Sequence, residues 1–516
     1  MSPMTTGNSG DRFNFAAFLF EENRGRAQKT AYVDDRRTQS YGELEEAARR
    51  FATVLTARGV RREERIVLFM LDSVELPIAF LGALFAGVVP VLVNTMLPSG
   101  DVAYMIEHSN ARLVVASEEL APTYQPALGS LRAFDHEPML IVAGEPSTPD
   151  GFHSVLAASS PAPQPARTYA DDIALWLYSS GSTGRPKAVA HTHDNIRQTV
   201  ELYGKPIFGV TEHDTVFSAA KLFFAYGLGN GLSFPLAVGA RVLLMAGRPT
   251  PEAIFRRLIE QRVTIFCGAP TTYVAMLASA SLPSRDTLSL RHAISAGEAL
   301  PEAVGARFEA HFGAPILDGI GSTEMLHIYL SNRLGDVRYG TSGRPVPGYE
   351  VEIRDENGHP VPMGELGDLW VSGPSAALMY WRDRKRTQAT FFGPWMKTGD
   401  KYRTLPSGHL EYAGRSDDML KVSGQYVSPI EVEAALQTHD AVFEAAVVGK
   451  IDEQGLMRTV AYVVVRGAPA GGDSLAQELK AHVKARLSPH KYPREVHFVD
   501  ELPKTATGKV QRYRLR

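Results

Sequence analysis

Short apolar runs and amphipathic segments alternate along the first part of the chain. Between residues 64 and 115, apolar runs of strand length (residues 65–71, 89–94 and 112–117) are separated by segments of helical character. Parallel strands need a crossover connection, and when both faces of the sheet are covered the strands read as continuous apolar runs. The pattern therefore predicts a covered, mostly parallel sheet.

The same alternation resumes after residues 145–171, a stretch rich in Pro, Ser and Ala that we expect to be a surface connection. After residue 343 short strands alternate with Gly and Pro turns, which predicts a mostly antiparallel piece. Between these points we expect helices at residues 195–203, 251–261 and 271–280 and strands at residues 173–177, 188–191, 214–218, 240–245 and 263–268.

A domain boundary is expected at residues 415–418. Residues 419–426 have the pattern of a tight hairpin. Ser428, Pro429 and Glu431 then supply an N-cap, a proline at the first helical position and an acidic residue at the third, which predicts a helix start.

The predicted fold class is α/β, with α+β character at the C-terminus. A large domain would span residues 1–416 and hold the covered, mostly parallel sheets and the small antiparallel piece. A small α+β domain would span residues 417–516. Its further expected elements are strands at residues 445–449 and 459–466 and an amphipathic helix at residues 474–487.

Composition narrows the class of protein. The 516 residues are 44% hydrophobic and 22% charged, as in ordinary globular proteins. A net charge of -3 and a pI near 6.6 argue against a nucleic-acid or anionic-membrane surface. The uncharged run Leu76–Val93 has the length of a membrane span, but two prolines and two glycines divide it, so we expect a buried helix and a strand.

The only cysteine, Cys267, lies in an apolar run that reads as a buried strand. One cysteine excludes an intrachain disulfide and a Cys-based zinc site, and it agrees with a reducing cytoplasm. The polar first residues lack the apolar core of a signal peptide. We therefore expect a cytoplasmic protein.

One stretch carries the chemistry of a phosphate site. Residues 178–187 read YSSGSTGRPK and combine hydroxyls, glycines and two cations after an apolar strand. Glycines allow successive backbone N–H groups to turn inward around an anion, and hydroxyls add donors. The spacing of P-loop NTPases is absent, because Pro186 precedes Lys187 and a return strand follows where a helix would begin.

Three more motifs follow in order along the chain. DGIGSTE at residues 318–324 is a Gly-rich turn that closes on an acid, and KTGD at residues 397–400 places a carboxylate on a Gly turn, where it can accept from ribose hydroxyls. PKTATGKVQR at residues 503–512 carries Lys509 after a Thr and Gly turn. Each of these motifs is common by itself, but the whole set in this order along one chain is rare.

In this order the motifs resemble those of the adenylate-forming enzymes, a superfamily of acyl-CoA and aryl-CoA synthetases, firefly luciferase and nonribosomal peptide adenylation domains. The resemblance extends over nearly the whole chain and includes GRSDDMLKVSGQYVSPIEVE at residues 414–433. KLFFAYGLGN at residues 221–230 and DGIGSTEMLHIYLSN at residues 318–332 are similar to benzoate-CoA ligases in particular.

The resemblance implies a two-step reaction with ATP, Mg²⁺ and coenzyme A. A carboxylate attacks the α-phosphate of ATP to give an acyl-AMP and pyrophosphate, and the CoA thiol then displaces AMP. By motif, the implied binding residues are Ser180, Gly181, Ser182, Thr183, Gly184 and Lys187 for the β- and γ-phosphates; Thr323 and Glu324 for phosphate and Mg²⁺; Ala296, Gly297, Glu298, Asp318, Gly319 and Ile320 for adenine; and Asp400 and Arg415 for ribose.

Lys509 matches the catalytic lysine of the first step, with Lys187 and Glu324 as the other catalytic residues. The second step needs space for the thiol, so the C-terminal domain is expected to rotate about Asp417. The rotation would present the hairpin residues Lys421, Ser423 and Gly424 to CoA. We also expect Lys509 to be a target of regulatory acetylation, because neutralising its charge would stop the first step.

The acid pocket is implied to be aromatic. Residues 221–231 contain no carboxylate to pair with an amino-acid ammonium, and they supply aromatic side chains that suit a flat, apolar acid. By position the resemblance assigns Ala225, Tyr226, Gly321, His327 and Ile328 to this pocket.

The leading hypothesis is thus an AMP-forming aryl-CoA ligase acting on benzoate or a close analogue. Three alternatives remain open: a ligase for short-chain, medium-chain or cyclic aliphatic acids, a nucleotide-binding homologue without catalysis, and luciferase-type oxidation, which the motifs alone do not separate. Two positions depart from the superfamily pattern. Ile320 replaces an aromatic residue on the adenine face, and Ala188 replaces a Gly, which would narrow the φ freedom of the loop.

Overall fold

The computed structural model describes residues 11–131, 137–144, 151–179, 185–422, 425–452, 457–467, 472–488, 491–504 and 510–516. The chain forms two compact units: a larger one of residues 1–339, 343–350 and 372–396, and a smaller one of residues 340–342, 351–371 and 397–516. The expected rotation of the C-terminal domain about Asp417 is a motion that a single structure does not test, so it stays a prediction.

A seven-stranded sheet in the larger unit carries the predicted phosphate loop. Its strands β3, β4, β5, β6 and β7 are parallel, and β8 and β18 are added antiparallel at one edge. The predicted parallel arrangement is confirmed. In spatial order the strands are β18 (Met379–Tyr380), β8 (Lys187–Thr192), β7 (Ile173–Ser179), β4 (Val89–Leu92), β3 (Arg65–Phe69), β5 (Leu113–Ser117) and β6 (Met139–Ala143).

A nine-stranded sheet of the same unit carries the DGIGSTE motif, which begins on its strand β13. Its strands β9 to β13 are parallel, β14 returns antiparallel to β13, and β11 contains the buried Cys267 as expected. In spatial order the strands are β15 (Arg344–Pro345), β14 (Ile328–Ser331), β13 (Ile316–Gly321), β12 (His292–Ser295), β11 (Ile265–Gly268), β9 (Thr215–Ser218), β10 (Arg241–Leu243), β1 (Thr30–Val33) and β2 (Thr38–Ser40).

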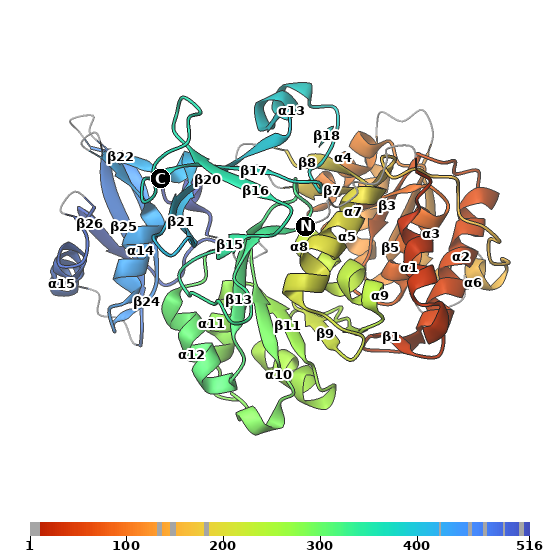
Figure 1. Cartoon of the computed structure of the whole chain (residues 1–516), viewed down its shortest axis with the longest axis horizontal. Coiled ribbons are helices and arrows are strands. Elements are labelled where there is room, and N and C mark those ends of the chain that lie inside the picture. Colours follow the sequence, from red (N-terminus) through yellow and green to blue (C-terminus); the bar gives the residue numbers. More distant parts are fainter. Residues whose placement is uncertain are drawn as a thin grey trace. The chain divides into compact units, whose positions relative to one another are not determined.

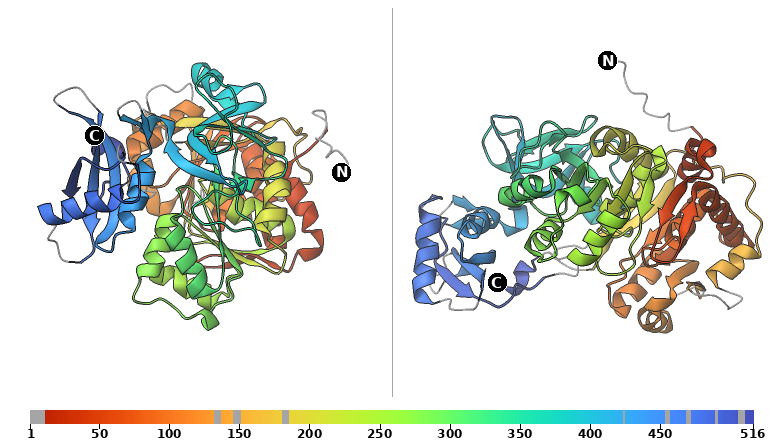
Figure 2. Two further views of the ribbon diagram at one scale, coloured as in Figure 1. Left: turned by 60° about the vertical axis from the view of Figure 1, so that its left-hand side comes forward. Right: turned by 90° about the horizontal axis from the view of Figure 1, so that it is seen from below.

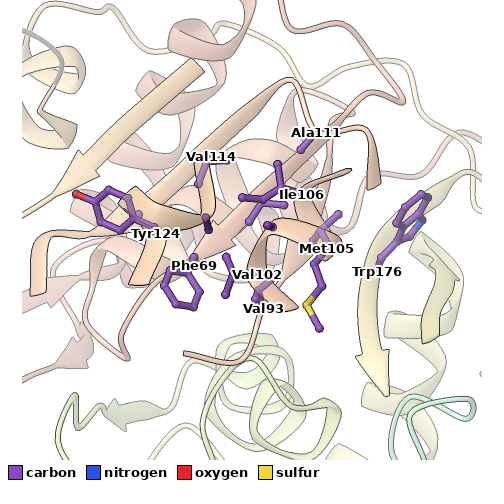
Figure 3. Close-up of a cluster of buried hydrophobic side chains, with 14 of the residues drawn as sticks. Phe69, Val93, Val102, Met105, Ile106, Ala111, Val114, Tyr124 and Trp176 are labelled. Carbon is purple, nitrogen blue, oxygen red and sulfur yellow. The ribbon is translucent and has the colours of Figure 1, made fainter. Parts of the chain in front are cut away.

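Helices cover these sheets, as Figure 1 shows. Apolar residues of α4, such as Val102 and Ile106, pack on strand residues Phe69, Val114 and Trp176 in the core drawn in Figure 3. The helices of this unit are α1 (Phe15–Glu22), α2 (Tyr41–Ala57), α3 (Glu75–Phe85), α4 (Ser99–Ser109), α5 (Ala121–Gly129), α6 (Phe152–Ala157), α7 (His193–Thr199), α8 (Ala225–Leu228), α9 (Phe234–Val238), α10 (Pro251–Glu260), α11 (Pro270–Ala278), α12 (Glu302–Phe312) and α13 (Arg384–Thr390).

The apolar run Leu76–Val93 forms helix α3 and strand β4, as predicted. Every residue of α3 is buried, since the helix packs against α2, so its apolar character serves the core. Within the part of the chain that the structure describes, no helix is both long and apolar enough to cross a membrane.

The smaller unit contains mostly antiparallel strands, with β26 parallel to β25, and two helices. Strands β20 (Trp395–Thr404) and β21 (Leu410–Arg415) pair antiparallel, in a sheet that also contains β16 (Glu350–Arg354), β17 (Gly367–Ser372) and β19 (Phe391–Phe392). Helices α14 (Pro429–Gln437) and α15 (Asp473–Lys484), drawn in blue in Figure 2, pack on the last sheet. That sheet consists of β24 (Val442–Ile451), β25 (Met457–Val465) and β26 (Glu495–Phe498), and the hairpin before it of β22 (Leu420–Val422) and β23 (Gln425–Val427).

Two local expectations are refined. The helix expected at residues 195–203 begins at His193 and changes at Val200 into a π-helical segment that contains Pro206, a residue without the N–H that a regular helix needs. The connection at residues 145–171 contains the short helix α6. The predicted helix start at Ser428 is confirmed, because its hydroxyl accepts a hydrogen bond from the Glu431 N–H at 3.1 Å.

Candidate active site

The predicted phosphate loop, Ser180 to Gly184, lies outside the described residues, but both of its ends are described. Strand β7 ends at Ser179 and β8 begins at Lys187, and these two residues are partners in the antiparallel ladder. The loop therefore starts and ends at one edge of the sheet. Lys187 is the first residue of strand β8.

The Lys187 ammonium lies beside Glu324 and Tyr380. Its Nζ is 3.9 Å from Oε1 of Glu324 and 4.7 Å from the centre of the Tyr380 ring. The Tyr380 hydroxyl donates to the same Glu324 oxygen at 2.8 Å. Both charged side chains are largely buried, with 18% and 14% of their surfaces exposed. The structure thus brings together two predicted catalytic residues that are far apart in the sequence.

Ala188 is accommodated without strain. It lies in strand β8, its residue is fully buried, and its carbonyl accepts a hydrogen bond from the Trp381 N–H at 2.9 Å. It is not among the residues with positive φ. The expected loss of φ freedom therefore does not arise, because an extended strand accepts alanine readily.

The turn that carries Thr323 and Glu324 is anchored from β8. Nε2 of His191 lies 2.7 Å from the Thr323 carbonyl oxygen and donates to it. Burial lowers the pKa of His191 to about 4, so the imidazole is neutral at physiological pH. The Glu324 carbonyl in turn accepts from the Ala377 N–H at 2.8 Å.

The two segments predicted to line the adenine are neighbours. Ser295, the last residue of β12, is in register with Asp318 on β13, so Ala296, which follows it, lies beside Gly319. A Cβ on Gly319 would lie 2.6 Å from the Leu330 carbonyl oxygen, so the close approach of β14 to β13 requires glycine. Burial raises the pKa of Asp318 to about 8. The other residues assigned to this surface are Gly297, which has a φ of +97°, Glu298 and Ile320.

The residues predicted for the acid pocket also meet. Nε2 of His327 lies 3.3 Å from the Tyr226 carbonyl oxygen, and Gly321 pairs with Ile328 across β13 and β14. The Tyr226 hydroxyl donates to the Ile294 carbonyl at 2.9 Å, which ties helix α8 to strand β12. Ala225 is the first residue of that helix.

His327 is enclosed by aromatic rings. Its ring centre lies 5.1 Å from that of Tyr203, 5.8 Å from that of Tyr226 and 4.5 Å from that of Phe234. Burial lowers the pKa of His327 to about 3, so the imidazole is uncharged at physiological pH. The arrangement is a buried aromatic cluster with one uncharged polar ring in it.

The smaller unit brings the predicted ribose residues together. Arg415 donates through Nη1 to Oδ1 of Asp400 at 3.0 Å and to the Thr398 carbonyl at 3.3 Å. Asp417 lies in the short helical turn Ser416–Asp418, and Lys421 lies on β22. Ser423, Gly424 and Lys509 lie outside the described residues.

Residues 19–381 match the family of AMP-binding enzymes, and residues 431–509 match the C-terminal domain of the same enzymes. The chain belongs to the AMP-binding enzyme family. The first match includes the motifs at residues 178–187 and 318–324, and the second reaches Lys509 of the last motif, so the predicted superfamily and fold class are confirmed.

Similar members of this family are ligases of aromatic acids. The chain is 52% identical over 510 residues to a benzoate-CoA ligase of Thauera aromatica, covering 98% of this chain and 96% of the relative. It is 44% identical over 514 residues to a 4-hydroxybenzoate-CoA/benzoate-CoA ligase of Rhodopseudomonas palustris, covering 98% and 94%. A crystal structure of a benzoate CoA ligase from Burkholderia xenovorans LB400 aligns with a TM-score of 0.91 at 59% identity, covering 98% of this chain and all of the other. This family member is an AMP-forming, ATP-binding acid-thiol ligase of the benzoate-CoA ligase type.

Three residues of the site were not expected from the sequence. Tyr380 contacts both Lys187 and Glu324, and Tyr203 and Gly229 enclose His327; a Cβ on Gly229 would lie 2.3 Å from Cδ2 of His327. None of them carries a charge or a nucleophile that would have drawn attention, although Gly229 lies within the quoted stretch at residues 221–230. The close Gly229 contact exists only because a π-helical segment, Gly229–Ser233, passes the ring.

Proposed function

We propose that this enzyme converts benzoate, or a close aryl analogue, to its CoA thioester. ATP and the acid would form an acyl-AMP and pyrophosphate, and CoA would then displace AMP. The observation that carries the proposal is the neutral His327 among three aromatic rings, together with the absence of a carboxylate between residues 221 and 231. Such surroundings favour the flat, uncharged ring of an aryl acid. They do not favour an amino acid, because its ammonium group would need a carboxylate as a partner.

Glu324 is suited to a Mg²⁺ ion that travels with ATP. Among the described residues no group of three or more His, Cys, Asp or Glu side chains could hold a metal ion by itself. Mg²⁺ is commonly bound by one or two carboxylates together with substrate phosphates and water, so a single carboxylate fits it. The ion would neutralise phosphate charge, while Lys187 would bind the phosphates from the other side.

The chain's remaining predicted residues would complete the two steps. Ser180 to Gly184 would hold the leaving pyrophosphate, Asp400 with Arg415 would bind the ribose, and Lys509 would supply charge to the first step. Rotation about Asp417 would then bring Lys421, Ser423 and Gly424 to the CoA side. We propose that the enzyme is located in the cytoplasm. Its proposed substrates ATP and CoA and its single buried cysteine agree with this location.

A panel of acids tests the substrate. We expect AMP and thioester formation with benzoate and with at least some hydroxy-, amino- or fluorobenzoates, and weak turnover of cyclohexanecarboxylate and hexanoate. The reason is that the rings around His327 complement a planar substrate. The release of AMP and the formation of thioester are measured for each acid. Turnover confined to the aliphatic acids would refute the aryl assignment and establish an aliphatic-acid ligase instead.

Replacing Gly229 by alanine tests the same pocket. The new methyl group would lie 2.3 Å and 2.6 Å from Cδ2 and Nε2 of His327, so the ring must move. We expect kcat/KM for benzoate to fall about 10- to 200-fold, the effect of one methylene in a tight pocket, with the KM for ATP little changed.

A second glycine provides the matched control for this variant. Gly100→Ala adds a methyl group with no heavy atom within 4 Å and should leave both constants unchanged. Equal effects of the Gly229→Ala substitution on benzoate and ATP would show that His327 does not contribute to the acid pocket.

Acetylation of Lys509 is proposed as a means of control. The modification removes the positive charge, so the first step should stop while the second continues. Mass spectrometry of the protein from cells grown on different carbon sources would detect it, and a lysine that is unmodified under all conditions would contradict the proposal.

A further inference from the structure

The segment of residues 375–381, here called the bracing segment, joins the two halves of the phosphate site through its backbone. Its Leu378 and Trp381 N–H groups donate to the Ala190 and Ala188 carbonyls of β8 at 3.0 and 2.9 Å. Its Ala377 N–H donates to the Glu324 carbonyl at 2.8 Å. Figure 1 shows its strand β18 at the end of the sheet beside β8. The strand that holds Lys187 and the turn that holds Glu324 are thus connected by one short segment.

The first residue of the bracing segment, Ser375, is also anchored by hydrogen bonds. Ser375 donates from Oγ to the Met325 carbonyl at 2.7 Å, and its Oγ also lies 2.7 Å from the Tyr349 hydroxyl. Ser375 is fully buried. Glu324 and Met325 are therefore bonded to the segment, while Thr323 is held by His191 of β8, which leaves little freedom for the turn.

Tyr380 is the side chain of this segment that contacts both charges. It is buried, with 3% of its surface exposed, and its hydroxyl donates to Oε1 of Glu324 at 2.8 Å. The Lys187 ammonium lies 4.7 Å from the centre of its ring, within the range of a cation–π contact. Burial, and then the charge of Glu324, raises the pKa of Tyr380, so the phenol keeps its proton and remains a donor.

We propose that Tyr380 is a positioning residue for the metal-nucleotide site, with its hydroxyl orienting the Glu324 carboxylate and its ring orienting the Lys187 ammonium. The Tyr380 and Lys187 contacts to the Glu324 carboxylate both fall on Oε1. The other oxygen, Oε2, is then the one available to a cation. This inference rests on the proposed role of Glu324 toward Mg²⁺ and deepens it.

The Tyr380→Phe variant removes the hydroxyl and keeps the ring. Groups that hydrogen-bond a metal ligand typically change metal affinity or activity 10- to 100-fold when they are lost. We expect the Kd of Mn²⁺, used in place of Mg²⁺ and measured by electron paramagnetic resonance with α,β-methylene-ATP, to rise by about this factor. Formation of the acyl-AMP should fall in parallel and recover partly at high Mg²⁺, whereas thioester formation from supplied acyl-AMP should be unchanged.

Tyr380→Leu removes the ring as well. It should additionally raise the KM for ATP, because the Lys187 ammonium loses its aromatic partner. Thermal denaturation of both variants shows whether the fold is retained, and the Phe variant preserves nearly all of the buried volume. The difference between the two variants therefore separates the hydroxyl from the ring.

A second tyrosine–glutamate pair provides a matched control. In the same unit the Tyr339 hydroxyl donates to Oε2 of Glu309, also at 2.8 Å. Tyr339→Phe should leave Mn²⁺ binding and acyl-AMP formation unchanged. Mn²⁺ affinity of Tyr380→Phe equal to that of the wild type would overturn the proposal. Absence of acyl-AMP formation by the wild type with any aryl acid would instead refute the proposed function, and the Mn²⁺ comparison would still be informative.

Discussion

Replacement of Lys509 by alanine should abolish acyl-AMP formation while thioester formation from supplied acyl-AMP continues. In the first step two anions, the carboxylate and the α-phosphate, must meet, and negative charge grows on the bridging oxygens. A unit charge pair at about 4 Å and an effective dielectric constant near 20 is worth about 4 kcal/mol, on the order of a thousandfold in rate. The two half-reactions are measured separately, as pyrophosphate release and as CoA thioester formed from benzoyl-AMP.

The matched control for this loss of charge is another lysine of the C-terminal region. Lys484 lies on helix α15, where its ammonium stacks on the Tyr492 ring at 4.1 Å, and Lys484→Ala should leave both half-reactions intact. A Lys509→Ala enzyme that loses both half-reactions together would contradict the division of labour between the steps. An enzyme that retains both would remove Lys509 from the mechanism.

Glu324→Gln should lower acyl-AMP formation on the order of a hundredfold to a thousandfold. The substitution keeps the shape and the hydrogen bond from Tyr380 but removes the negative charge, which Mg²⁺ requires and which Lys187 faces at 3.9 Å. Loss of a preorganised charged group in a water-poor site has effects of this size. The rate is measured across Mg²⁺ concentrations, together with Mn²⁺ binding in the presence of α,β-methylene-ATP.

The metal readout separates this variant from Lys509→Ala. Mn²⁺ binding should weaken in Glu324→Gln and remain normal in Lys509→Ala, although both lose the first step. Glu309→Gln is the control, since Glu309 also accepts a tyrosine hydroxyl but lies outside the site. Unchanged Mn²⁺ affinity in Glu324→Gln would assign the loss of rate to something other than the metal.

Local features of the sequence predicted most elements of the fold. The apolar runs between residues 64 and 115 became β3, β4 and β5 of a parallel sheet, and the Ser428–Glu431 cap became a helix start. These features act over a few residues, so their outcome does not depend on the rest of the chain. The π-helical segment after Thr199 was missed because tertiary packing and Pro206, not periodicity, decide it.

The candidate site was only partly predictable, because its parts are joined by tertiary contacts. The ordered motifs named Lys187, Glu324, Asp400 and Arg415, and the structure brings each pair into contact. Ala188 looked unfavourable in the motif, yet it is an ordinary residue of an extended strand. The apolar pattern had already predicted a strand at residues 188–191, and this strand, not the neighbouring loop, determines the backbone of Ala188.

The sequence by itself determined the family, the chemistry and the identity of the charged residues, because these depend on side-chain type and order along the chain. Only the tertiary structure decided what surrounds those charges. Tyr380 is more than fifty residues from Glu324 in sequence and reaches it because β18 adds to the edge of the sheet beside β8. Likewise, Gly229 matters because a helical segment passes the His327 ring at van der Waals distance. Such contacts arise from packing over long sequence separations, which no local pattern encodes.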